Sequence, residues 1–322
     1  MCFYCDHNVI AASVEGADNH LFLRTVAEHY GGLYSKAGNG ICHFVQCQRF
    51  AEPGKTLLGS DSHTCTGGAL CMLAIGSGGL TVAECAMGLG FRMIMPRVMA
   101  VHLTGTLRSG VAAKDIALEM LRQLTVKGGR GYILGFVGDG VEQLSVSQRQ
   151  TIANMCVESG AFTGIFPSDE QTRIFLRAQC REEVYQPLAA DSDANYDWNL
   201  TIDLNMLEPL VACPAMPDQV KRVAKVDVIP NSVFIGSCTN GSYQDIARAA
   251  ASLKGRKVAP HIDLTIGPGS RQVLAQLVET GVLGDLIAAG ARILECSCGP
   301  CIGIGQVPPT NGTIVAPPSN PA

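Results

Sequence analysis

An alternation of strands and helices in the last third of this 322-residue chain restricts its fold more than any other feature. Apolar stretches indicate strands at 233–237, 262–266 and 292–295, and apolar residues recur at helical spacing at 243–253 and 271–279. Strands joined by helices of this length pair in parallel through right-handed crossovers. The sequence therefore predicts an α/β protein built of three-layer α/β/α domains with parallel sheets.

Three cysteines follow two of these predicted strands. Cys238 comes directly after the strand at 233–237, and the sequence Cys-Gly-Pro-Cys places Cys298 and Cys301 just after the last strand. The carboxyl ends of parallel strands meet at one edge of a sheet, which is where such folds bind ligands. Three thiolates gathered there would close one side of a metal centre and leave the other side open.

Three kinds of site compete for these cysteines. A redox disulfide of the thioredoxin type needs a helix after the first cysteine, but Cys301 leads into Ile-Gly-Ile-Gly-Gln-Val-Pro-Pro, which cannot continue one. A zinc ion needs a fourth ligand, and Cys296 offers only a tight Cys-X-Cys arrangement with Cys298. An iron-sulfur cluster with one iron that lacks a cysteine ligand ranks first on spacing, and the other two remain open.

Length and composition predict two or three domains, because 47% of the residues are hydrophobic and a chain this long exceeds one ordinary core. We expect a first α/β domain at 1–97, a second at 98–205 and a third at 206–322, which carries the cysteines. The polar, acidic stretch at 186–230 is expected to be a linker region.

Charge and hydropathy exclude some classes of protein. A net charge of −4 without a basic run argues against nucleic acid as the main partner. The apolar runs are interrupted well before membrane-spanning length, and the N-terminus lacks the plan of a signal peptide, so we expect a cytoplasmic location without membrane association. Most of the fourteen cysteines stand singly in apolar contexts, which favours reduced thiols.

Acid–base and hydrogen-bonding residues occur at several points before the cysteines, mostly in predicted turns. A turn at 38–40 is expected to feed a short strand whose exposed end carries His43. Asn154 and Glu158 are four residues apart and should share one helix face. Each residue alone could be a cap or a solvated side chain; the set is Asp6, His7, His43, Asp61, Ser62, His63, Asn154 and Glu158.

Taken together, these motifs resemble those of the aconitase family, which includes aconitate hydratase, homoaconitase and the large subunit of 3-isopropylmalate dehydratase. The likeness covers nearly the whole chain, and the motifs stand in the order of that family. They are Asp6-His7-Asn8, Gly-Asn-Gly-Ile-Cys-His (38–43), Gly-Ser-Asp-Ser-His-Thr (59–64), Asn154 to Glu158, Gly-Ser-Cys-Thr-Asn (236–240) and Cys-Gly-Pro-Cys (298–301).

The resemblance implies a hydro-lyase with a 4Fe-4S cluster whose open iron acts as a Lewis acid on a hydroxy acid. His7, oriented by Asp6, would deliver a proton to the leaving hydroxyl, and Asp61 and His63 would hydrogen-bond the iron-bound water or hydroxyl. The implied cluster ligands are Cys238, Cys298 and Cys301.

Further roles follow from the same resemblance. Ser62 and Asn154 would hold substrate or cluster, and His43 would pair with Glu158. Details of the motifs resemble the bacterial aconitate hydratase branch, so we expect citrate and isocitrate as substrates, as in the tricarboxylic acid cycle. The alternative is the large subunit of a dehydratase for isopropylmalate or homoaconitate.

Some family features are missing from the sequence. The family carries an Asn-Arg-Asn-Phe motif after the cysteine pair and a swivelling domain, in cis or as a separate small subunit, with the base and the substrate-binding arginines. Residues 318–322, Pro-Ser-Asn-Pro-Ala, stand where that motif is expected. We therefore expect a fragment with no more than trace activity alone. An alternative of another class is a non-catalytic iron-sulfur sensor.

Overall fold

The computed structural model of the chain describes residues 1–307 and 314–315. The chain forms two compact units. The first, called the terminal unit, comprises 1–45 and the described part of 228–320, and the second, called the central unit, comprises 46–227. These boundaries do not coincide with the expected ones at 97 and 205, and the division into three domains stays a prediction.

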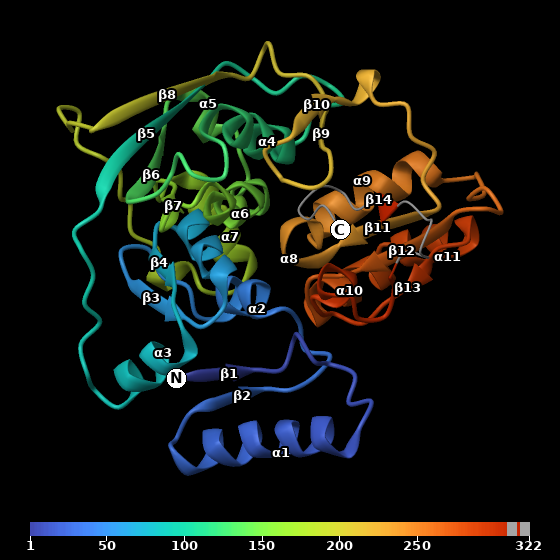
Figure 1. The fold of residues 1–322 in the computed structure, drawn as a ribbon, viewed down its shortest axis with the longest axis horizontal. Helices are drawn as coiled ribbons and strands as arrows, with labels where there is room; N and C mark the ends of the chain where they lie inside the picture. Colours follow the sequence, from blue (N-terminus) through green and yellow to red (C-terminus); the bar gives the residue numbers. More distant parts are fainter. Residues whose placement is uncertain (308–313, 316–322) are drawn as a thin grey trace. The chain divides into compact units, whose positions relative to one another are not determined.

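The terminal unit is built around a parallel sheet with the strand order β13-β12-β11-β14 (Figure 1). The α/β class with parallel sheets is thus confirmed, and helices α9 and α10 have the predicted bounds. The elements are β1 (Cys2–Tyr4), α1 (Val14–His29), β2 (Leu33–Ser35), α2 (Cys42–Arg49, which runs on into the central unit), β11 (Ser232–Gly236), α8 (Ser237–Asn240), α9 (Tyr243–Leu253), β12 (Asp263–Gly267), α10 (Arg271–Glu279), α11 (Val282–Ala289), β13 (Arg292–Ile293), the 3-10 turn η5 (Gly299–Ile302) and β14 (Ile314–Val315).

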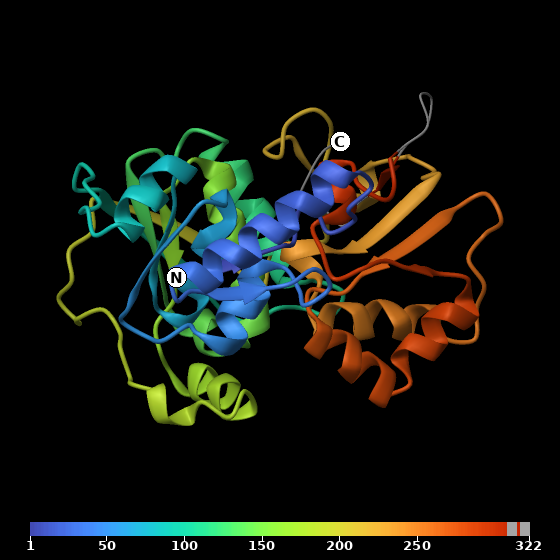
Figure 2. The ribbon, with the colours of Figure 1, turned by 90° about the horizontal axis from the view of Figure 1, so that it is seen from below.

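Helices α9, α10 and α11 cover one face of this sheet (Figure 2). Their apolar residues meet those of β12 in one core, which includes Ile246, Leu264, Ile266, Leu277 and Leu286.

No single helix among the described residues is long and apolar enough to span a membrane, although the pair α10 and α11, bent by 86°, passes that test of length and composition together.

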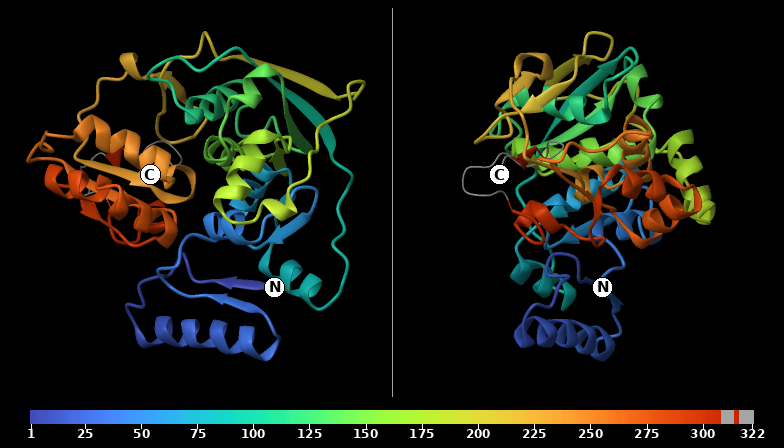
Figure 3. Two further views of the ribbon diagram at one scale, coloured as in Figure 1. Left: turned by 180° about the vertical axis from the view of Figure 1, so that it is seen from behind. Right: turned by 90° about the vertical axis from the view of Figure 1, so that its right-hand side faces the viewer.

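The N-terminal segment of the terminal unit is tied to the loops of the sheet. Strands β1 and β2 pair in parallel, and α1 lies along them (Figure 3). Downstream, the N–H of Ile41 donates to the Gly269 carbonyl at 2.9 Å, and Gly40 bridges Ser270. Gly40 is required there, because a Cβ would stand 2.8 Å from Ser270 Cα and φ is +145°. These contacts join residues 40–41 to the loop that follows β12 at the carboxyl end of the sheet.

The central unit contains a second parallel sheet, ordered β7-β6-β5-β8, and a two-stranded parallel ribbon of β3 and β4. Helices α4 and α6 pack against one another beside this sheet. The elements are β3 (Thr56–Gly59), the 3-10 helix η1 (Ser62–Leu70), β4 (Leu73–Gly76), α3 (Gly79–Ala86), β5 (Arg97–Thr104), α4 (Ala113–Leu124), β6 (Tyr132–Val137), α5 (Asp139–Glu142), α6 (Val146–Met155), η2 (Cys156–Ser159), β7 (Thr163–Ile165), α7 (Glu170–Ala178), η3 (Glu182–Val184), β8 (Trp198–Asp203), β9 (Leu210–Ala212), β10 (Val220–Arg222) and η4 (Val223–Lys225).

The expected linker at 186–230 was wrong in part, because it contains β8. This strand pairs with β5 at the edge of the sheet, and Leu200 and Ile202 point into the core between exposed neighbours. Successive side chains of a strand point to opposite faces of the sheet, and in β8 one face meets the core while the other is exposed, so the strand is polar at alternate positions. The acidic residues before it hid this alternation.

Candidate metal centre and acid–base groups

The turn after β11 presents Cys238. Gly236 ends the strand with φ +147°, and a Cβ on it would stand 2.1 Å from the Gly267 carbonyl oxygen, so only glycine fits. Ser237 follows in the left-handed region with φ +64°, which is uncommon for a residue with a side chain. This sharp turn places Cys238 in the short helix α8, directly beyond the carboxyl end of the strand.

Cys298 caps the N-terminus of a single 3-10 turn, η5, beyond β13, and Cys301 lies within this turn. The N–H of Cys301 donates to the carbonyl of Cys298 at 3.2 Å, and Pro300 occupies the first turn. Gly303 ends the turn with φ +75°. Within the described residues up to 307, no α-helix follows Cys301, as the sequence predicted.

The three cysteines come together in the terminal unit. Cys238 and Cys298 are buried in one apolar cluster with Ile41 and Phe44. The thiol of Cys301 donates to the Ser237 hydroxyl at 2.9 Å, and this hydroxyl lies 3.9 Å from Cys238 Sγ. Three soft sulfur donors in a largely buried, apolar setting suit an iron-sulfur cluster held by three cysteines.

The electrostatic setting of Cys298 disfavours a redox role. Burial raises its pKa to about 12, and the charge of Cys238 adds to this, although a hydrogen bond from His7 opposes it. Reactive redox cysteines instead have a lowered thiol pKa. Burial likewise raises the pKa of Cys296 to about 11. None of the fourteen cysteines, all of which lie at or before position 301, forms a disulfide in the structure.

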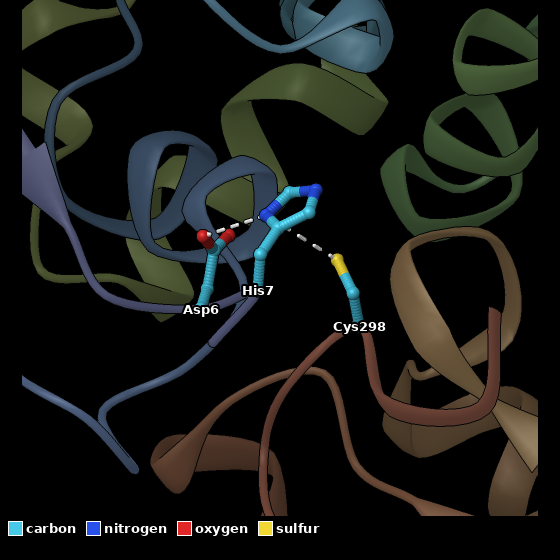
Figure 4. Close-up of side chains that lie close together, drawn as sticks. All are labelled: Asp6, His7 and Cys298. Carbon is cyan, nitrogen blue, oxygen red and sulfur yellow. Dashed lines mark hydrogen bonds and ion pairs between the residues drawn. The ribbon is translucent and has the colours of Figure 1, made fainter. Parts of the chain in front are cut away.

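Asp6 and His7 stand beside Cys298 (Figure 4). His7 Nδ1 lies 3.1 Å from Asp6 Oδ1 and 3.9 Å from Cys298 Sγ. The other carboxylate oxygen, Asp6 Oδ2, accepts the backbone N–H of Cys42 at 2.6 Å. Burial would raise the pKa of Asp6, but the hydrogen bonds from His7 and Cys42 outweigh it, so this pKa is lowered. Asp6 is therefore an anchored carboxylate at neutral pH.

The expectation that a strand carries an exposed His43 was wrong. His43 lies in the first turn of α2, and only 5% of it is exposed. The N–H groups of a first helical turn lack partners within the helix. Here the carboxylate of Asp6 accepts a hydrogen bond from the backbone N–H of Cys42. This contact bridges 36 residues, so no local pattern could indicate it.

A second polar group lies within the central unit. Asp61 caps η1 by accepting the N–H of His63 at 2.7 Å. The Ser62 hydroxyl lies 3.3 Å from His63 Nδ1, and Glu158 Oε1 lies 3.2 Å from His63 Nε2. Both ring nitrogens of His63 therefore face hydrogen-bonding oxygens. In the central unit the carboxylate of Glu158 faces His63, and its expected pairing with His43 stays a prediction.

Asn154 supports this second group through hydrogen bonds that run by way of Thr66. Helix α6 ends at Met155, so Glu158 lies in η2 and the two residues do not share one helix face as expected. Asn154 is fully buried, and its Nδ2 donates to Thr66 Oγ1 at 2.9 Å. The Thr66 hydroxyl in turn donates to the carbonyl of His63 at 2.7 Å. Asn154 therefore positions the turn that carries His63.

Three residues of these groups were missed by sequence reasoning, namely Cys42, Thr66 and Ser237. Each acts through a contact that its neighbours in sequence do not reveal. Only Ser237 had a signal, because it stands between a glycine and a predicted metal ligand at a strand end. Its hydroxyl links Cys301 to Cys238.

Comparison with known proteins identifies relatives of the whole chain. The sequence matches the Aconitase family (aconitate hydratase) over residues 3–230 and 222–320. It is 36% identical over 303 residues to the 3-isopropylmalate dehydratase large subunit of Elusimicrobium minutum, a match that covers 94% of this chain and 72% of that protein. It is 38% identical over 329 residues to the mitochondrial aconitate hydratase of Schizosaccharomyces pombe, with 93% of this chain but 42% of that protein covered.

A solved structure shares the fold. The crystal structure of aconitase X (holo-form) from Thermococcus kodakaraensis has a TM-score of 0.50 to this chain at 13% sequence identity. The likeness covers 89% of this chain and 67% of that one. At this identity the comparison bears on the fold alone.

Proposed function

The chain belongs to the aconitase family of hydro-lyases, and we propose that it is the cluster-binding large subunit of a dehydratase that acts on isopropylmalate. The observation that carries the chemistry is the meeting of three cysteine thiols with an Asp–His pair inside one unit. Loss of water from a hydroxy acid needs a Lewis acid at the hydroxyl and a proton for the leaving oxygen. In this proposal the three thiols hold the metal centre that acts as the Lewis acid, and the Asp–His pair supplies the proton.

The cofactor in this proposal is a 4Fe-4S cluster held by Cys238, Cys298 and Cys301. Such a cluster supplies Lewis acidity at the iron that has no cysteine ligand, toward the hydroxyl and carboxylate of the substrate. Ser237 would keep the thiols of Cys238 and Cys301 in place through its hydroxyl.

His7 is the proton donor in this proposal. Asp6 Oδ1 lies 3.1 Å from Nδ1 of the imidazole ring, and in this proposal Nε2 carries the proton toward the leaving oxygen. The His7 side chain is 45% exposed, whereas that of Asp6 is 6% exposed. Substrate can therefore reach the imidazole while the carboxylate that orients it is shielded from water.

The group around His63 supplies further polar contacts in the proposal. Glu158 and Ser62 face the two ring nitrogens and fix the orientation of the imidazole. Asp61 fixes the backbone of the turn, and Asn154 supports it through Thr66. Hydrogen bonding of Asp61 and His63 to the hydroxyl that leaves, and of Ser62 to the substrate, stay predictions.

Relatives support one choice of substrate over the other. The motifs had led us to expect citrate. However, the match covers 72% of the length of a 3-isopropylmalate dehydratase large subunit and only 42% of the length of an aconitate hydratase. This favours the alternative, isopropylmalate. A relative named a large subunit also supports a separate small subunit as the partner that completes the enzyme. A cytoplasmic location remains a prediction.

The test combines the chain, with its cluster assembled under anaerobic conditions, and a candidate small subunit. Isopropylmalate, citrate and homocitrate are assayed with and without that subunit, and iron content is measured on the same samples. We expect turnover of isopropylmalate only when both subunits are present. Turnover of citrate at a higher kcat/KM would replace the proposed substrate, and absence of any turnover with a full cluster would refute the proposed function.

A further inference from the structure

We propose that, before the cluster is assembled, Asp6, His7 and Cys298 form a separate binding site for one thiophilic divalent ion such as Zn²⁺. One ligand atom from each residue lies within 4.8 Å of the other two, and all three residues belong to the terminal unit. This inference does not rest on the proposed dehydratase activity. It concerns which ion the protein binds when its cluster is missing.

The distances within the group suit a single ion. His7 Nδ1 is 3.1 Å from Asp6 Oδ1 and 3.9 Å from Cys298 Sγ, and all three side chains point toward one another (Figure 4). Zinc binds nitrogen and carboxylate oxygen at about 2.0–2.2 Å and thiolate sulfur at about 2.3 Å. Ligand atoms around such a tetrahedral ion are about 3.3–3.7 Å apart. The two spacings from His7 Nδ1 lie within about 0.2 Å of this range, and no two of the three ligand atoms are more than 4.8 Å apart.

Backbone contacts hold the three residues in this arrangement. The N–H of Cys298 donates to the carbonyl of Asp6 at 3.1 Å, which joins two segments 292 positions apart. Asp6 Oδ2 is occupied by the N–H of Cys42 at 2.6 Å, so the carboxylate keeps its other oxygen turned toward His7. Outer contacts of this kind fix the orientation of metal ligands and raise metal affinity.

The donor set selects the kind of ion. One thiolate, one neutral imidazole and one carboxylate together carry a charge of −2, which balances a divalent cation. Sulfur and imidazole donors favour Zn²⁺ or Co²⁺, whereas Mg²⁺ and Ca²⁺ require oxygen ligands. The bond that forms is between the ion and Cys298 Sγ; the bond that breaks is the thiol S–H, whose proton passes to the buffer. The fourth position would hold water, because His7 lies at a partly exposed edge.

The consequence is competition. Cys298 cannot serve this ion and the cluster at the same time, so an ion bound here would block cluster assembly. A zinc ion held by all three cysteines would block it too, but the two arrangements depend on different residues. The single-ion site needs Asp6 and His7, and it does not need Cys238 or Cys301.

The test uses the full chain purified without iron, with Zn²⁺ and Co²⁺ as probes. The double variant Cys238→Ser/Cys301→Ser removes the three-cysteine set and keeps the proposed ligands. We expect it to bind one Co²⁺ or Zn²⁺ per chain, with the cobalt absorption showing a single thiolate ligand. Adding His7→Ala or Asp6→Asn to this variant is expected to weaken binding at least tenfold, whereas adding His29→Ala, on α1, is expected to leave it unchanged.

Two results would overturn the proposal. One is a double variant that is folded by circular dichroism but binds no ion in the micromolar range. The other is binding that survives both His7→Ala and Asp6→Asn, which would place the ion elsewhere. In the wild-type chain, bound Zn²⁺ should slow the appearance of cluster absorption, and His7→Ala should relieve that delay.

Discussion

Replacing Asp6 by asparagine tests how the buried carboxylate acts on His7. The variant keeps the shape of the side chain and an oxygen for the Cys42 N–H. Its NH₂ group then takes the place of the carboxylate oxygen 3.1 Å from His7 Nδ1. Because Asp6 is only 5% exposed, water cannot take over the lost interaction with a protonated imidazole.

The expected loss follows from the strength of that contact. A hydrogen bond to a charged group contributes about 1.5–3 kcal/mol. Since each 1.36 kcal/mol corresponds to a tenfold change in rate, kcat should fall about 10- to 100-fold. KM should stay within about twofold, because Asp6 faces His7 and the backbone of Cys42. The high-pH limb of the activity profile should move to lower pH, because the imidazolium loses its counter-charge.

The assay measures kcat, KM and their pH dependence on protein with matched iron content, with Asp18→Asn on the exposed face of α1 as the control. A loss of kcat below threefold with an unshifted pH profile would refute the role of Asp6.

The stability of the fold gives a second readout. The folded-state pKa of Asp6 lies below its ordinary value of 3.8, so its carboxylate stabilises the fold above about pH 4, and this contribution disappears as the pH falls through the folded pKa. The stability gap between wild type and variant should therefore shrink below about pH 4.

Three further substitutions, one of them a control, test the architecture. Arg149 is fully buried and forms two bonds to Asp169 as well as bonds to three carbonyls, so Arg149→Met should lower the free energy of unfolding by about 3–5 kcal/mol. The control Arg122→Met, at an exposed ion pair, should lower the free energy of unfolding by less than about 1 kcal/mol. Equal losses of unfolding free energy for Arg149→Met and Arg122→Met, measured by urea unfolding, would contradict this account. Gly236→Ala should prevent iron binding, because its Cβ would meet the Gly267 carbonyl at 2.1 Å; normal iron content would show that the turn can relax.

Hydrophobic periodicity sufficed to predict much of the fold. Helices α9 and α10 have the bounds expected from their apolar spacing, and the alternation of strands and helices correctly predicted parallel sheets. These elements are long or strongly patterned, so local sequence and tertiary structure agree. Cys238 and Cys298 were expected beyond the ends of two strands of one sheet, and they lie beyond β11 and β13, on either side of β12.

Short segments were harder to predict, for different physical reasons. The run Ile-Cys-His-Phe-Val at 41–45 is apolar and too short to separate strand from helix by spacing. A carboxylate 36 positions away completes the helix there by accepting the N–H of Cys42. Strand β8 has only two buried residues, and an acidic segment precedes it in the sequence, so its pattern resembles that of a loop.

Partners of the functional side chains could be predicted least. The contact between His63 and Glu158 spans 95 residues, and the buried contact between Asn154 and Thr66 spans 88. Sequence motifs identify residue types that can do acid–base chemistry, but packing decides which of them meet. Asn154 illustrates this, because its contact with Thr66, which supports the turn of His63, was not foreseen, while its expected role toward substrate or cluster stays a prediction.

Iron and sulfide content after anaerobic cluster assembly tests the central claim most directly. Wild type and the control Cys296→Ser, whose cysteine is buried two positions from Cys298, are expected to hold about four iron and four sulfide per chain. Cys238→Ser, Cys298→Ser and Cys301→Ser should each hold less than about one iron and lose the visible absorption of the cluster. Full iron content in any of these three variants, or its loss in Cys296→Ser alone, would contradict the proposed ligand set.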